Sequence, residues 1–154
     1  MNPSPLPPTP IFHRRLDFRV LGLDPNTLRV LAALEDMMHH FILTVDVRLP
    51  EMTIAAAALE IPRFPNRRCL LIRPAVDKLV GLKIERGFTD RVKSFLLGPQ
   101  GCTNLFNLVV NACPLALNTA GALPYFFSDQ SFTESREKMK AVMKDQCIAW
   151  SKDP

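Results

Sequence analysis

Residues 41–49 show a period of two, the pattern of a half-buried β-strand, with Ile42, Thr44, Asp46 and Arg48 on the second face. The apolar face holds Phe41, Leu43, Val45, Val47 and Leu49. Weaker alternation marks residues 16–23 and 27–34, which the turn signal Asp24-Pro25-Asn26 separates. After the turn at Pro50-Glu51 we expect residues 52–61 to run back as a further strand, because a two-residue turn joins antiparallel neighbours.

Beyond residue 62 the apolar positions recur with helical spacing instead. Prolines at 62, 65 and 74 predict a loop that contains Cys69, and helices are expected over 74–80, 88–97, 102–112 and 116–122. Ser131 and Glu134 form a capping box at the start of a last helix. Strands first and helices after predict an α+β fold, in which an N-terminal antiparallel meander of three to four strands carries the helices on one face.

The composition of the chain predicts two parts, a tail and a folded domain. The chain has 154 residues, of which 47% are hydrophobic and 22% charged, as in globular proteins. Five prolines crowd the first ten residues, so we expect residues 1–11 to form a proline-rich flexible tail and residues 12–150 a single α+β domain. No apolar run reaches the roughly 18 residues of a membrane span, and the chain opens on no secretory signal. We therefore expect a cytoplasmic protein.

The charge distribution argues against nucleic acid as a partner. Nineteen Lys and Arg against 15 Asp and Glu give a net charge of +4, and these charges are mostly dispersed. Nucleic-acid binders carry a denser basic stripe interleaved with aromatic residues. A protein partner, in a homo- or hetero-oligomer, is the expected alternative.

Two of the four cysteines are candidates for chemistry. Cys102 follows Gly101 at the start of an expected helix, where the helix dipole favours a thiolate, and Cys69 has Arg67 and Arg68 beside it, which favour a thiolate too. The alternative is that both cysteines are small packing residues. Cys113 and Cys147 fall on apolar helical stripes, which predicts core packing.

A metal site follows from these thiols if a histidine joins them. His39 and His40 open the best strand, and only one of them can face a site because adjacent strand residues point to opposite faces. One imidazole with Cys69 and Cys102 would give three soft ligands, which suit zinc or an iron–sulfur cluster. The alternative is that both histidines begin the strand in solvent. Arg67, Arg68 and Asn104 are the candidate ligand-binding residues beside the cysteines.

Several short segments occur in an order that resembles a bacterial protein family of unknown function, whose hallmark reads Gly-Cys-Thr-His-Leu. The resemblance covers about residues 12–122 and rests on His39-His40-Phe41, the stretch 62–69, Leu79-Val80-Gly81, Arg86-Gly87-Phe88, the run 101–105 and the run 116–119. This chain has Asn104 at the hallmark histidine and His40 where the family is expected to have aspartate. The resemblance implies that a family metal site using that histidine would be degenerate here.

The order of elements also resembles the iron–sulfur scaffold proteins of the IscU/NifU type. That fold has a three-stranded antiparallel sheet, then a cysteine loop, then helices with a cysteine at a helix start. The likeness implies that Cys69 and Cys102 match two scaffold cysteines, while His39 or His40 lies near the place of the remaining one. It concerns the fold, and a fold does not determine a function.

Three functions remain open at this point. The first is a small accessory or binding protein with a zinc or iron–sulfur pocket, intact or degenerate. The second is a non-catalytic structural subunit of a larger bacterial enzyme complex, which its proline-rich tail would lie along. The third is a thiol-dependent enzyme that uses Cys102 as nucleophile.

Overall fold

A computed structural model describes residues 10–128, 131–145 and 148–151 of the chain. Four antiparallel strands form one sheet in the order β1-β2-β3-β4, so that each strand pairs with its neighbours in the sequence. Their bounds are β1 (Arg14–Asp24), β2 (Thr27–Asp36), β3 (His40–Arg48) and β4 (Thr53–Arg63). The predicted meander is confirmed with four strands, and each strand end lies within two residues of the predicted one.

The alternating pattern explains which face of the sheet is buried. Val30 lies opposite Val45 and Leu34 opposite Phe41, and all of these side chains are buried. The residues between them point to the other face and remain partly exposed. A period of two therefore gives the sheet one apolar face and one solvated face, as expected for an antiparallel sheet with a single covering layer.

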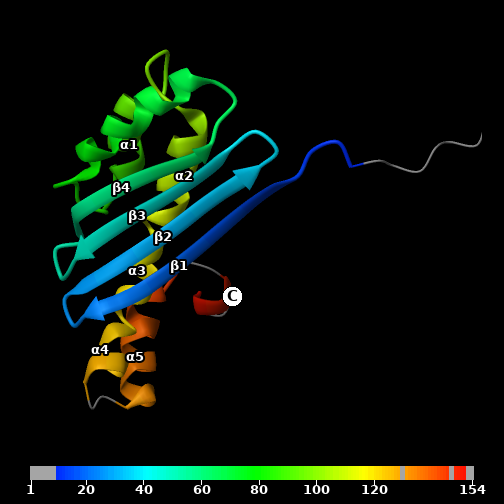
Figure 1. Ribbon diagram of the computed structural model, residues 1–154. Helices are drawn as coiled ribbons and strands as arrows, with labels where there is room; N and C mark the ends of the chain where they lie inside the picture. The colour runs from blue at the N-terminus through cyan, green and yellow to red at the C-terminus, as the bar shows by residue number, and fades with distance from the viewer. Residues whose placement is uncertain (1–9, 129–130, 146–147, 152–154) are drawn as a thin grey trace, which may run out of the picture.

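Helices cover the apolar face, as the order of elements predicts (Figure 1). Their bounds are η1 (Arg67–Leu79), α1 (Phe88–Leu96), α2 (Thr103–Ala112), α3 (Leu115–Ala120), α4 (Leu123–Phe127), α5 (Phe132–Met143) and η2 (Ile148–Trp150). Helices α2 and α3 pack on β2, and η1 packs on β4. The capping box at Ser131 and Glu134 is present and begins α5.

The predicted loop around Cys69 is wrong in its extent. The 3₁₀ helix η1 begins at Arg67, before the predicted helix start at residue 74. The Asn66 side chain accepts a hydrogen bond from the Arg68 N–H at 2.8 Å, which satisfies a donor at the helix start. Cys69 therefore lies in the first turn of a helix that continues through Pro74.

The two edges of the sheet differ. Along β4, the N–H groups of Ile54 and Ile84 donate to the carbonyls of Leu82 and Met52, so the segment after η1 covers the first part of this edge. Strand β1 forms the opposite edge, and no strand of the described part of the chain pairs with its outer side (Figure 1).

Within the described residues, no helix is long and apolar enough to cross a membrane. Residues 1–9 of the expected tail lie outside the described residues, so the tail and the single domain over 12–150 stay predictions.

Candidate functional site

Cys69 and Cys102 line the same pocket, which has a volume of about 410 Å³. Both are free thiols and both are half-buried. The pocket lies between the first turns of η1 and the loop that joins α1 to α2, and it is lined by Arg68, Cys69, Leu71, Ile72, Pro99, Gln100, Gly101 and Cys102. Two segments distant in the sequence thus bring two sulfur atoms to one cavity.

A tight loop fixes the position of Cys102. Gly98 ends α1 with a φ of 90°, which only glycine adopts without strain. The Cys102 N–H then donates to the Leu96 carbonyl at 2.7 Å, so the chain folds back on the end of α1. At Gly101 a Cβ would come within 2.2 Å of the Leu96 carbonyl oxygen. Cys102 is therefore held by a loop that has no room for a side chain at the preceding residue.

The start of η1 fixes Cys69 by a similar local device. The Cys69 N–H donates to the Asn66 carbonyl at 2.9 Å. Three residues further on, Ile72 is buried and anchors the helix to the core. The side chain at position 69 is left half-buried beside the pocket, with the Arg68 guanidinium as the charged group that lines the same pocket.

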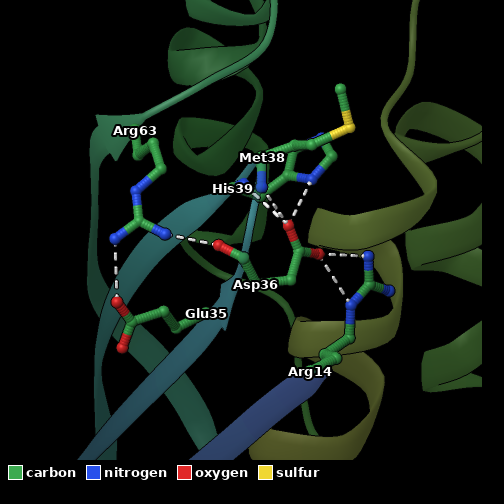
Figure 2. A network of polar contacts seen from close by, with 6 residues as sticks. All are labelled: Arg14, Glu35, Asp36, Met38, His39 and Arg63. Carbon is green, nitrogen blue, oxygen red and sulfur yellow. Dashed lines mark hydrogen bonds and ion pairs between the residues drawn. The ribbon is translucent and has the colours of Figure 1, made fainter. Parts of the chain in front are cut away.

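The histidines are not part of this pocket. His39 lies in the turn between β2 and β3, where its Nδ1 is 3.1 Å from Oδ1 of Asp36 (Figure 2). The same oxygen accepts hydrogen bonds from the N–H groups of Met38 and His39 at 2.8 and 2.7 Å. Arg14 donates to the other oxygen through Nε at 2.9 Å and through a terminal nitrogen at 2.6 Å. We call Arg14, Asp36, Met38 and His39, together with Arg63, the Asp36 cluster.

The Asp36 cluster holds a buried charge whose partners are all supplied by the protein. The Asp36 side chain is 0% exposed. Burial by itself would raise the pKa of Asp36, but the hydrogen bonds from Arg14, from the N–H groups of Met38 and His39, and from the His39 ring outweigh it and hold the pKa well below its usual range. Arg63 also donates to the Asp36 carbonyl and pairs with Glu35 at 2.9 Å. This cluster ties β1, β4 and the β2–β3 turn together.

His40 lies elsewhere again. It is the first residue of β3 and lines a shallow hollow with Asp17 and Arg19 on the solvated face of the sheet. In the part of the chain that the structure describes, no group of three or more His, Cys, Asp or Glu side chains could hold a metal ion. The expected convergence of an imidazole on Cys69 and Cys102 is therefore not seen, because His39 lies in the turn before β3 and His40 lies on the solvated face of the sheet.

The remaining candidates divide between the pocket and its surroundings. Arg68 lines the pocket, whereas Arg67 and Asn104 are not among its lining residues. Cys113 is fully buried, as predicted, and burial raises the pKa of its thiol to about 12. Cys147 lies outside the described residues.

Sequence reasoning missed the role of Asp36, although a signal was present. Asp36 directly precedes the short turn at Met37 and Met38. Aspartate at such a position commonly accepts hydrogen bonds from N–H groups two or three residues further along. That pattern would have identified His39 as a partner of Asp36 before any metal site was considered.

Residues 22–118 match a family that is described as a protein of unknown function, DUF2889. This range includes β2, β3 and β4, the pocket and the Asp36–His39 turn. No curated protein and no solved structure matches the chain. Because the match covers more than half of the residues, the chain belongs to the DUF2889 family.

Proposed function

We propose that this protein is a small binding or accessory protein, and that its ligand site is the pocket lined by Cys69 and Cys102. The observation that supports the proposal most is that two free thiols, carried by η1 and by the start of α2, line one cavity. Both segments are held by backbone hydrogen bonds, so the two thiols are positioned before any ligand arrives.

Zinc is the metal ion that this pair of thiols would fit. Thiolates are soft ligands that select zinc or iron–sulfur clusters over magnesium or calcium. An iron–sulfur cluster usually takes four cysteine ligands, and the described pocket offers two, so a resident cluster does not fit it. Zinc takes four ligands, so Cys69 and Cys102 would hold the ion and leave two positions for other groups. The histidines have no part in this ligand set.

The charge of Arg68 indicates what kind of group would fill the two remaining positions on the zinc ion. Two thiolates neutralise a divalent zinc ion, and Arg68 adds a positive charge at the same pocket. An anionic co-ligand, such as a carboxylate or a thiolate of a small molecule or a partner protein, would balance this charge. Structural zinc sites are closed by four protein ligands, so a site with two protein ligands would be open to a group from outside the chain.

The thiol-enzyme alternative has less support, because the described pocket lining offers Arg68 but no imidazole or carboxylate to act as general base beside Cys102.

The experiment is a zinc titration of the full chain, purified without oxygen, against a chromogenic chelator. We expect one zinc ion to bind per chain. Cys69→Ser and Cys102→Ser should each weaken binding by more than the roughly tenfold loss that follows removal of an outer-shell partner. Cys69→Ser should keep the thermal midpoint of the metal-free protein, because its side chain is half-buried at the pocket. Cys102→Ser should lower that midpoint slightly, because Cys102 also packs against the core.

Cys113→Ala is the matched control, since Cys113 is buried away from the pocket and its loss should leave zinc affinity unchanged. His40→Ala tests the rival ligand set in the same way. Zinc affinity that survives both pocket substitutions, or that falls with His40, would overturn the proposal. If the chain bound no zinc, the metal-site hypothesis would be wrong and the pocket would be a candidate site for an organic ligand.

A further inference from the structure

We infer that the free edge of β1 is an interface with a second copy of this chain, in which two β1 strands pair antiparallel and join two sheets into one. An edge strand presents unpaired N–H and C=O groups along its outer side, and these are a template for another strand. Strand β1 is long, with 11 residues, and the covering segment that protects the start of β4 has no counterpart along it in the described chain.

The charges on β1 favour one register. Arg15, Asp17 and Arg19 share the solvated face of the strand, and Asp17 contacts both arginines at 3.4 and 3.1 Å. A two-fold axis through Phe18 would place Asp17 opposite the partner's Arg19 and Arg19 opposite the partner's Asp17. Opposite charges directly across an antiparallel pair stabilise it, and like charges destabilise it.

Neighbouring registers are worse on this count. A two-fold axis through Asp17 or through Arg19 would put like charges opposite each other. An axis through Leu16 also pairs Arg15 with the partner's Asp17, but it shortens the pairing between the β1 strands. The register centred on Phe18 pairs residues 14–22 of both copies, which is most of the strand. The register centred on Arg19 would be longer, with residues 14–24 of both copies, but it puts Arg19 opposite Arg19. Of the two registers that place opposite charges across the axis, the one through Phe18 gives the longer pairing, so charge complementarity selects it.

The apolar face of β1 gives independent support. Leu16 lies on the side of β1 that faces the core, opposite Leu34, yet it is 44% exposed, because the helices leave this end of the strand uncovered. At the other end, α4 lies against Gly22, where a Cβ would come within 2.6 Å of the Phe127 ring. Helices α4 and α5 lie past the β1 edge in Figure 1, and Phe127 is 42% exposed.

The two-fold axis brings these two ends together. In the register centred on Phe18, Gly22 lies opposite the partner's Arg14, with the partner's Leu16 next along the same face. Phe127 of one copy would then cover the exposed Leu16 of the other, and the reverse contact would form at the second α4. The exposed apolar surface at both ends of β1 is buried by one symmetric contact, as closed dimers require.

The experiment is a charge swap read by sedimentation equilibrium over a range of protein concentrations. The wild-type chain should dimerise. Asp17→Arg places two pairs of arginines across the axis and should weaken the dimer by about tenfold or more. Adding Arg19→Asp to that variant restores opposite charges across the axis and should recover much of the affinity. The zinc affinity and thermal midpoint of the monomer should change little, since both side chains are on the solvated face.

Phe18→Cys checks the register separately. Residues directly opposite in an antiparallel pair have Cα atoms about 4.5–5.5 Å apart, which a disulfide can bridge. We expect mild oxidation to link two copies of this variant and not two copies of Arg29→Cys, which carries its thiol on β2. A wild-type chain that stays monomeric at all concentrations, or a double variant that dimerises no better than Asp17→Arg, would overturn the inference.

Discussion

The Asp36 cluster and the Cys69–Cys102 pocket are two places where the described part of this chain gathers polar and ionisable side chains, and they differ in whether those side chains already have partners within the protein. In the cluster, the protein itself supplies partners to both oxygens of a buried carboxylate, from β1 and from the turn before β3. In the pocket, two thiols and one guanidinium line a cavity of about 410 Å³. The first arrangement is closed and stabilises the fold, whereas the second is open and can accept a ligand.

This difference shows how a structural polar group can be told apart from a candidate ligand site. Burial and a strongly shifted pKa are common at functional sites, yet here both are properties of Asp36, whose role is structural. The pocket is instead distinguished by two segments that converge around a cavity. Buried polar groups whose hydrogen bonds are all made within the protein stabilise the fold, and they have no free position with which to bind a ligand. Four substitutions at these two places test the separation.

The largest effect is expected from Asp36→Ala. It leaves Arg14 without its buried partner and removes the acceptor of two N–H groups, so the free energy of unfolding should fall by about 3 kcal/mol. Denaturant unfolding measures this directly. Glu85→Ala is the matched control, because Glu85 pairs with Arg91 at 3.4 Å on the surface and should contribute less than about 1 kcal/mol. Equal losses in the two variants would show that the cluster is not structural.

The stability that Asp36 contributes should depend on pH in one direction. Its pKa is lower in the folded chain than in the unfolded chain, so the contribution is complete above the unfolded value of about 4 and is lost as the pH falls below it. Comparing wild type with Asp36→Asn between pH 7 and pH 2 isolates this effect. The difference in unfolding free energy should stay constant down to about pH 4 and then shrink. A difference that grows in acid would have the wrong sign.

Gly101→Ala should have the next largest effect and should act on the pocket. The added Cβ would meet the Leu96 carbonyl oxygen and the Leu97 nitrogen, which are backbone atoms and cannot move aside cheaply. We expect a loss of about 1–3 kcal/mol in unfolding free energy, as for overpacking, together with weaker zinc binding because Cys102 is displaced. Gly121→Ala, with nothing within 4 Å of the new Cβ, should be neutral or slightly stabilising. If Gly101→Ala behaved like that control, the loop would not position Cys102.

His39→Ala is expected to have the smallest effect. It removes the ring contact with Asp36 and should lower the unfolding free energy by about 1 kcal/mol, the usual net contribution of one hydrogen bond. His40→Ala leaves the Asp36 cluster intact and should cost less. Neither variant should alter zinc affinity. A loss of zinc binding without a loss of stability in His39→Ala would return this residue to the metal site.

Much of the fold could be predicted from the sequence, because local patterns carry it. The alternation at residues 41–49 and the turn at Asp24-Pro25-Asn26 gave the meander, and the Ser131 capping box began α5. Apolar spacing does not show the start of η1, since the prolines at 62 and 65 favour a loop and the helix begins at the Asn66 cap. Periodicity reports burial, and it is a poor guide to where a helix begins.

The candidate site was predicted in part for the same reason. Each cysteine is marked by its own neighbours in the sequence, whereas the position of Cys69 and Cys102 at one pocket depends on how η1 and the α1–α2 loop pack. The position of His39 could not be predicted in the same way, because it depends on the contact of His39 with Asp36. Arg14 reaches Asp36 only through the pairing of β1 with β2. The sequence predicts the β1–β2 hairpin but not its register, so it does not show that Arg14 lies opposite Asp36.

Zinc-edge X-ray absorption on the zinc-loaded chain tests the central claim most directly, because it counts the atoms bound to the metal. The account predicts two sulfur ligands at about 2.3 Å, with oxygen, nitrogen or sulfur from outside the chain in the other positions, and a sulfur count that falls in both Cys69→Ser and Cys102→Ser. A spectrum without sulfur, or one with imidazole scattering that disappears in His39→Ala, would contradict it.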